Sequence, residues 1–185
     1  MSAGVDLVAH LPDYRIARGR TAADYRITDA AIAEAARRRV GVITTTAASR
    51  YAIKSRPEHA SAIRQGYADN IRRLRSAGVP LLIGSDTFDG SVLDEVDNLD
   101  QLCLMPRSGL LRAATATTPR ALFPTRDISH FAEGAAASLV ALPADPLRDL
   151  QALRRPSILI KQGLAGPDLD GRAKTPTSIQ SKSAD

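Results

Sequence analysis

Two side chains in this sequence combine useful chemistry with a useful position, namely Asp86 and His10. Asp86 directly follows the apolar run 79–84 and Ser85, and His10 ends the run 5–9. A carboxylate can ligate a metal or accept a proton from metal-bound water, and imidazole is the commonest zinc ligand. Each residue also has a structural interpretation, since Asp often forms turns after strands and a lone His often has only a packing role. The residue types alone leave both interpretations open.

The other histidines and motifs offer less. His59 lies near the start of a predicted helix and His130 in a polar loop, and both are expected to have surface or local structural roles. The run Thr44–Thr46 could line a pocket, although β-strand propensity explains it equally well. The sequence contains no His-x-His pair, no His-Glu-x-x-His and no Gly-x-Ser-x-Gly, and no phosphate-binding glycine loop of the usual spacing. Any chemistry therefore rests on His10 and Asp86.

A parallel sheet is predicted to bring these two residues together. Apolar runs at 5–8, 40–46 and 79–84 indicate strands, and the segments between them have helical periodicity. Thr28 is a good N-cap for the first helix, and Gly78 with Pro80 ends the second. Strands that are apolar throughout and alternate with helices are typical of parallel sheets covered by helices, so the fold class is α/β. His10 and Asp86 would then share the carboxyl edge of that sheet.

The chain downstream of Asp86 is predicted to be helical and then to change character. Ser91, Ser108 and Thr118 are the expected helix starts. Short strands of a separate small sheet are expected at 136–142 and 157–161, and residues 164–185 are expected to form a disordered tail because they are rich in Gly, Pro, Ser, Lys and Asp. The predicted organisation is a first domain at 1–127, an appended β segment at 128–163 and the tail.

The charge and composition of the chain limit the classes of binding partner that are expected. The net charge is +5 and the pI about 9.8, but the densest basic groups, 37–39 and 72–75, fall at the predicted carboxyl ends of helices, where cations complement the helix dipole. Aromatic residues do not alternate with them as a base-stacking platform requires, so no nucleic-acid partner is expected. With no signal peptide and no apolar run near ~20 residues, we expect no membrane partner and a cytoplasmic location. The single Cys103 is expected to be buried in its apolar run.

Several segments together resemble the amidohydrolase superfamily, with imidazolonepropionase-like and Xaa-Pro dipeptidase-like members nearest. Gly4–His10 is similar to that family's sixth barrel strand, which ends in an active-site His, and Ala77–Asp86 is similar to the eighth, which ends in an active-site Asp. Ala114–Leu122 resembles the helix after the barrel, and segments between Ala132 and Gly163 resemble the closing β segment. The resemblance covers about residues 3–163 in the family's order.

This resemblance implies strands 6–8 of a metal-dependent hydrolase (β/α)8 TIM barrel, with short strands of a small appended β-sandwich. It also implies one or two divalent metals, usually zinc, that activate water to hydrolyse carbon–nitrogen bonds other than ordinary peptide bonds. His10 would be a metal or substrate-polarising ligand, and Asp86 a metal ligand and the catalytic general base. The substrate would be a small-molecule amide or a dipeptide-like compound.

The sequence lacks several active-site residues that are typical of this family. The family's first-strand His-x-His, fourth-strand Lys and fifth-strand His have no counterpart here, and catalytic zinc usually has three protein ligands. We therefore expect an incomplete chain that is a weak catalyst or none by itself, and that associates with a further copy or with a complementing N-terminal half. The alternative is a non-catalytic binding or scaffold protein derived from half a barrel.

Overall fold

The computed structural model describes residues 4–12, 17 and 19–166. The chain divides into two compact units, one extending through Ser129 and the other beginning at His130. The two units are described separately below.

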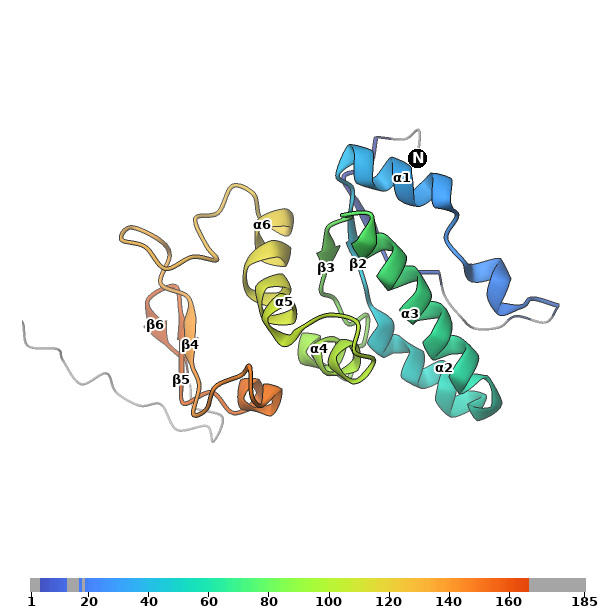
Figure 1. Ribbon diagram of the computed structural model, residues 1–185. Coiled ribbons are helices and arrows are strands. Elements are labelled where there is room, and N and C mark those ends of the chain that lie inside the picture. The colour runs from blue at the N-terminus through green and yellow to red at the C-terminus, as the bar shows by residue number, and fades with distance from the viewer. Residues whose placement is uncertain (1–3, 13–16, 18, 167–185) are drawn as a thin grey trace, which may run out of the picture. The chain divides into compact units, whose positions relative to one another are not determined.

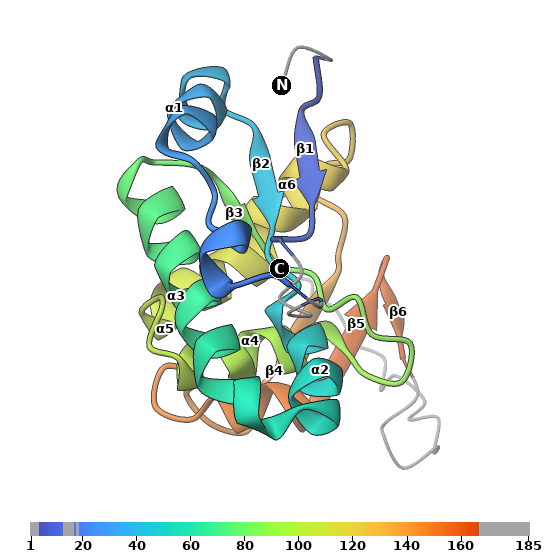
Figure 2. The same ribbon diagram turned by 90° about the vertical axis from the view of Figure 1, so that its right-hand side faces the viewer.

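The first unit contains a three-stranded parallel sheet (Figures 1 and 2). Its strands, in spatial order, are β1 (Leu7–Ala9), β2 (Gly41–Ile43) and β3 (Leu81–Leu82). Leu7 pairs with Gly41, and Val42 pairs with Leu81. A Cβ atom at position 41 would lie 2.7 Å from Leu7 Cδ2 and 3.1 Å from Leu82 Cδ1. Glycine at that position therefore lets both neighbouring leucines pack over the middle strand, and the predicted parallel arrangement is confirmed.

Helices cover the sheet as the alternating pattern predicts. Between the strands lie η1 (Ala22–Tyr25), α1 (Asp29–Arg38), η2 (Thr46–Ala48), α2 (Ser49–Ser55), η3 (Pro57–His59) and α3 (Ala60–Ser76). Thr28 is the N-cap of α1, since its side chain accepts a hydrogen bond from the Ala31 backbone N–H at 3.2 Å. Figure 1 shows α1 and α3 on the opposite side of the strands from α5 and α6. None of the helices in the described part of the chain has the length and apolar character that a membrane span needs.

The first unit has one apolar core. Its most deeply buried large side chains come from β3, from α3 and from the segments that follow the sheet: Ile63, Ile71, Leu74, Leu82, Leu99, Leu104 and Leu110. Fully burying an aliphatic side chain of this size contributes about 1.5–3 kcal/mol to folding. The basic residues of the α1 and α3 last turns lie outside this core, at the predicted helix ends.

Two of the predicted helix starts after Asp86 are wrong. The helix α4 (Val92–Gln101) begins after its Ser91 cap as expected. The next helix begins one residue before Ser108, after the extended Pro106, and runs as α5 (Arg107–Arg112), a π segment (Ala113–Thr117) and α6 (Thr118–Leu122). Thr118 therefore continues a helix instead of starting one. Because Pro119 has no backbone N–H, the α-type ladder is interrupted just where the wider π turn ends.

The burial predicted for Cys103 is also wrong, because its side chain is exposed. Cys103 follows the end of α4 in a left-handed conformation, with φ 50°, as is common where a helix ends. The reversal of the chain turns its side chain outward and places the neighbouring Leu104, which is fully buried, in the core.

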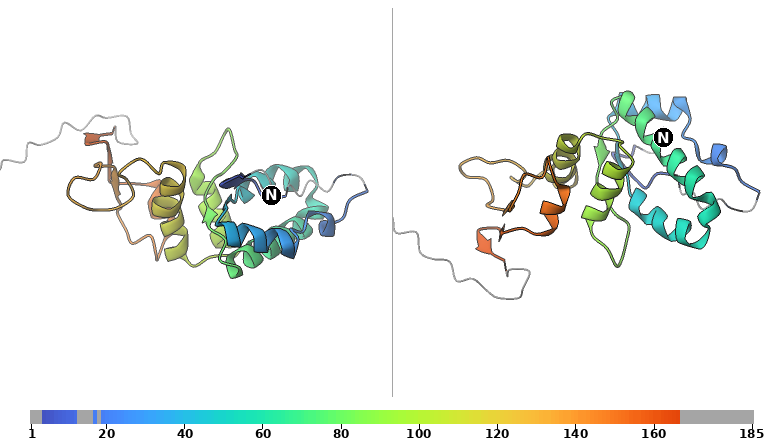
Figure 3. Two further views of the ribbon diagram at one scale, coloured as in Figure 1. Left: turned by 90° about the horizontal axis from the view of Figure 1, so that it is seen from above. Right: turned by 60° about the horizontal axis from the view of Figure 1, so that its bottom comes forward.

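The second unit contains a small antiparallel sheet (Figure 3). Its strands are β4 (Leu139–Ala141), β5 (Ile158–Lys161) and β6 (Leu164–Ala165), and a short helix η5 (Leu150–Arg154) lies between the first two. Leu164 and Ala165 were expected to start a disordered tail. They instead pair with β5, because Gln162 and Gly163 adopt positive φ and turn the chain back. The rest of that predicted tail, residues 167–185, lies outside the described residues.

Candidate active site

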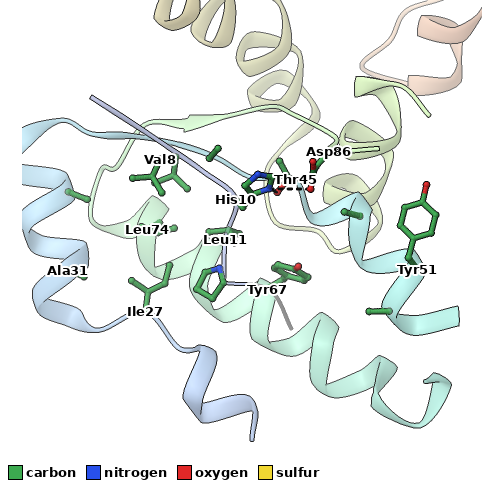
Figure 4. Close-up of a pocket in the computed structure, with 16 residues that line it drawn as sticks. Val8, His10, Leu11, Ile27, Ala31, Thr45, Tyr51, Tyr67, Leu74 and Asp86 are labelled. Atoms are coloured by element: carbon green, nitrogen blue, oxygen red, sulfur yellow. Dashed lines mark hydrogen bonds and ion pairs between the residues drawn. The ribbon is translucent and has the colours of Figure 1, made fainter. Parts of the chain in front are cut away.

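The carboxyl ends of the three parallel strands bring His10, Thr45 and Asp86 together (Figure 4). His10 Nδ1 lies 3.3 Å from Asp86 Oδ2 and 3.3 Å from Thr45 Oγ1. The side chains of His10 and Asp86 are each 52% exposed, so a ligand can reach both. The structure thus places the two residues singled out from the sequence in direct contact. It adds Thr45, which the strand propensity of its segment had left ambiguous.

All three residues have left-handed backbone conformations. The φ angles are 68° for His10, 54° for Thr45 and 49° for Asp86. Such conformations cost about 1–3 kcal/mol each for residues other than glycine, and a β-branched threonine is especially unusual there. Each strand therefore ends in a sharp corner that turns its polar side chain toward the same point. Strained conformations of this kind cluster at active and ligand-binding sites.

A glycine allows the ends of β2 and β3 to approach each other at this point. A Cβ atom on Gly84 would lie 2.6 Å from Ile43 Cγ2 and 3.6 Å from Thr45 Cγ2. The first of these distances is too short for any side chain, so the corner that carries Asp86 depends on glycine at position 84.

A mainly apolar cavity of about 640 Å³ lies beside these residues. Its lining includes His10, Thr45 and Asp86 together with Tyr67 and the apolar side chains Val8, Leu11, Ile27 and Leu74 (Figure 4). Small-molecule sites usually have volumes of roughly 300–1,000 Å³ and combine apolar walls with a few polar groups. The size and lining of this cavity are those of a small-molecule site.

A second hollow of about 600 Å³ shares Asp86 and Tyr51 with the first. Arg56, His59 and Phe88 also line it. His59, expected to have a local role, does pair with its neighbour Glu58 at 3.8 Å, but it also faces this hollow. His130 belongs to the second unit.

A polar cluster joins the loop after Asp86 to helix α2. Arg50 donates to Asp89 Oδ1 at 2.7 Å and to Asp94 Oδ2 at 3.2 Å, and the Tyr51 hydroxyl donates to the Asp89 carboxylate. The hydrogen bond from Tyr51, followed by the backbone N–H of Asp89 itself and the Arg50 guanidinium, holds the pKa of Asp89 below its usual value. No sequence pattern indicated this cluster, because its members lie far apart in the chain.

A buried carboxylate lies behind the Thr45 corner. Glu95 of α4 is fully buried and accepts hydrogen bonds from Thr46 Oγ1 at 2.9 Å and from the Ala47 backbone N–H at 2.6 Å. Burial raises the pKa of Glu95, and hydrogen bonds from Thr44, Thr46 and Ala47 oppose part of that rise. Glu95 was not among the residues expected from the sequence to have a functional role, although a charged residue on the apolar side of a helix is a signal that could have identified it.

The donor chemistry of His10 and Asp86 fits a divalent metal. Zinc binds imidazole nitrogen and carboxylate oxygen at about 2.0–2.2 Å, so two such donors on a tetrahedral ion lie roughly 3.3–3.4 Å apart. The observed separation between Nδ1 and Oδ2 is 3.3 Å. Within residues 4–12, 17 and 19–166, no group of three or more His, Cys, Asp or Glu side chains is placed to hold a metal ion. His10 and Asp86 are therefore suited to be two members of a ligand set.

Comparison of this chain with known proteins finds similar folds among solved structures. No family model matches the sequence, and no curated protein matches it. Among solved structures, the chain is similar to a Xaa-Pro dipeptidase with methionine bound in its active site, with a TM-score of 0.70 and 21% identity over 89% of this chain and 40% of that one. A proposed prolidase from Bifidobacterium longum matches with a TM-score of 0.68 and 23% identity, over 88% and 42% of the two chains. The A. niger ochratoxinase matches with a TM-score of 0.65 and 19% identity, over 75% and 34%.

These solved proteins are members of the amidohydrolase superfamily, so the resemblance expected from the sequence is confirmed at the level of the fold. The chain has an α/β fold that corresponds to part of the amidohydrolase fold. It spans about 40% of the length of the Xaa-Pro dipeptidase.

Proposed function

We propose that this chain is the part of an amidohydrolase-type hydrolase that contains barrel strands 6–8, here β1–β3, and that residues 128–163 are its appended β segment. The observation that supports this most directly is the contact between His10 Nδ1 and Asp86 Oδ2, 3.3 Å apart at the carboxyl ends of parallel strands. The fold shared with a Xaa-Pro dipeptidase and an ochratoxinase supports the same assignment.

The proposed reaction is hydrolysis of a carbon–nitrogen bond in a small amide or dipeptide-like substrate. One similar structure has methionine in its active site, and another, a prolidase, is complexed with N-methylphosphonate-L-proline. The apolar walls of the 640 Å³ cavity would accommodate an apolar side chain of such a substrate beside Asp86. Arg56 and His59 line the adjoining hollow, and the Arg56 guanidinium supplies positive charge near the same carboxylate.

A divalent metal, with zinc favoured by the donor types, would be held by His10 and Asp86. When bound, such an ion would lower the pKa of a water molecule enough for it to attack an amide carbon at neutral pH. The Asp86 carboxylate would accept a proton from the attacking water and is the general base of the proposal. Before the ion binds, the contact of Thr45 Oγ1 with His10 Nδ1 would hold the imidazole close to the orientation that the metal requires.

Because catalytic zinc usually has three protein ligands, His10 and Asp86 would need at least one more. We propose that further ligands come from a complementing N-terminal half or from another copy of the chain. The 185-residue chain by itself is therefore expected to be a weak catalyst or none.

Calorimetric titration with zinc tests this proposal. The chain is expected to bind zinc, and His10→Ala and Asp86→Asn should each weaken binding by more than about tenfold, since losing even an outer-shell partner typically costs 10–100-fold. His130→Ala is the matched control, because it removes an imidazole that the proposal does not assign to the ligand set and should leave the affinity unchanged. Zinc binding that survives both site substitutions would contradict the proposal.

A further inference from the structure

We propose that Glu95 is a positioning residue for this site. Its carboxylate holds the corner after β2 in the conformation that places the Thr45 hydroxyl against His10. The inference rests on the proposed function only for the statement that His10 and Asp86 form the functional site. The contacts within the corner are independent of what binds there.

Helix α4 holds this corner with two side chains that are three residues apart. The two carboxylate oxygens of Glu95 accept from Thr46 Oγ1 at 2.9 Å and from the Ala47 backbone N–H at 2.6 Å. Asn98 Nδ2 donates to the same Thr46 oxygen at 2.8 Å. Glu95 and Thr46 are completely shielded from water. A buried network in which each partner is satisfied gives a segment a single conformation.

The residue next to this network is the strained one. Thr45 has φ 54°, which is unfavourable for a β-branched residue by about 1–3 kcal/mol. The hydrogen bonds to the two following residues, Thr46 and Ala47, prevent the corner from relaxing to an ordinary extended conformation. Relaxation would turn Thr45 Oγ1 away from His10 Nδ1, which it contacts at 3.3 Å. Glu95 therefore acts on the position of His10 through Thr46 and Thr45.

The chemistry of Glu95 is specific, because the two groups through which it holds the corner, the Thr46 hydroxyl and the Ala47 N–H, both donate. A glutamine has the same size but only one acceptor oxygen, which can satisfy Ala47 N–H or the Thr46 hydroxyl but not both. A leucine satisfies neither. The corner should consequently loosen slightly in Glu95→Gln and more in Glu95→Leu.

Nuclear Overhauser contacts between the Thr45 side chain and the His10 ring test the proposal, measured on the metal-free 185-residue chain at one fixed pH at which Glu95 is ionised. We expect their intensity to fall at least twofold in Glu95→Gln and to disappear in Glu95→Leu. Glu95→Gln retains the shape of the side chain, so it provides the result if the leucine variant does not fold.

Asn70→Leu is the matched control for a purely structural effect. Asn70 is also fully buried and also anchors a loop, by accepting from Ile27 N–H and donating to the Tyr25 carbonyl, each at 3.0 Å. This variant should lose stability while its contacts between Thr45 and His10 keep their wild-type intensity. Unchanged contacts in both Glu95 variants, or an equal loss in Asn70→Leu, would overturn the positioning role.

Zinc affinity provides a second and separable measurement. In Glu95→Gln it should fall by about 10–100-fold, as is typical when an outer-shell residue that orients a ligand is lost. If the unmodified chain does not bind zinc, the proposed function fails. The contacts between Thr45 and His10 still decide the role of Glu95 in that case.

Discussion

The buried Glu95 should make the stability of the first unit depend on pH in a direction opposite to that of its surface carboxylates. Burial raises the pKa of Glu95 above its usual value of 4.5. In the native state Glu95 therefore retains a proton at pH values where the unfolded chain has released it. The stabilisation is fully present below about pH 4.5 and is lost as the pH rises through the native pKa.

The size of the effect follows from this linkage. Between the unfolded and the native pKa, one such group lowers the free energy of unfolding by at most about 1.4 kcal/mol per pH unit. Four exposed carboxylates have lowered pKa values, namely Asp24, Asp29, Glu34 and Asp89. They lose their contribution only as the pH falls through their native pKa values, below 3.8 for the three Asp and below 4.5 for Glu34. Among the carboxyl groups with shifted pKa values, Glu95 is therefore the one whose contribution to stability changes above pH 4.5.

Glu95→Gln is the informative perturbation, because glutamine resembles the protonated acid and does not titrate. At pH 4.5 it should cost only about 0.5–1.5 kcal/mol, the usual contribution of one hydrogen bond. Glu95→Leu should cost roughly 2–6 kcal/mol at the same pH, because it leaves both the Ala47 N–H and the Thr46 hydroxyl buried without an acceptor, at about 1–3 kcal/mol each.

Urea denaturation at half-unit steps from pH 4.5 to 8 measures the difference in unfolding free energy between the wild type and Glu95→Gln. Taking this difference cancels the contributions of all other titrating groups. We expect the advantage of the wild type to shrink and then reverse as the pH rises. A difference that stays constant over the whole range would refute the claim that burial controls the protonation of Glu95.

Three further predictions concern other parts of the chain. Leu82→Ala should lower the free energy of unfolding by about 2–5 kcal/mol in urea denaturation, because Leu82 is fully buried in β3. The control Leu164→Ala, at a residue that is 74% exposed, should change it by less than about 0.5 kcal/mol. Equal losses in the two variants would contradict the burial pattern. Tyr51→Phe should raise the pKa of Asp89, followed by carboxyl carbon NMR shifts, because the Tyr51 hydroxyl is the largest cause of its low value; an unchanged pKa would mean that the hydrogen bond does not form in solution. Cys103 is exposed and is the only cysteine in the sequence. A colorimetric thiol reagent should therefore modify one thiol per native chain as fast as it does in denaturant. Slower modification of the native chain would show that Cys103 is buried, as was expected from the sequence.

Local sequence signals predicted the framework of the first unit. Thr28 and Ser91 are the N-caps they were expected to be, because a cap depends on a side chain and a backbone N–H only two or three residues away. The parallel sheet followed from apolar runs alternating with helical periodicity. The same pattern placed His10 and Asp86 at one edge of the sheet, and they lie in contact there.

Predictions failed where neighbours distant in the chain, or backbone reversals, decide the outcome. Cys103 belongs to an apolar run, yet a left-handed residue at the end of α4 turns it outward. Thr118 and Pro119 have the composition of a helix start, yet the preceding helix passes through them by way of a π turn. In both cases the conformation of the neighbouring backbone decided the outcome and not the residue types.

By itself, the amino-acid sequence determined the α/β framework, the helix caps and the two side chains with metal-binding chemistry, since each of these depends on residue type and short-range spacing. Only the tertiary structure decided that Thr45 joins them, that three left-handed corners aim them at one point, and that Glu95 supports one of those corners. The hydrogen bond from Thr46 to Glu95 joins residues 49 positions apart. No periodicity encodes such a contact, because it exists only once the packed helix and sheet exclude water from both partners.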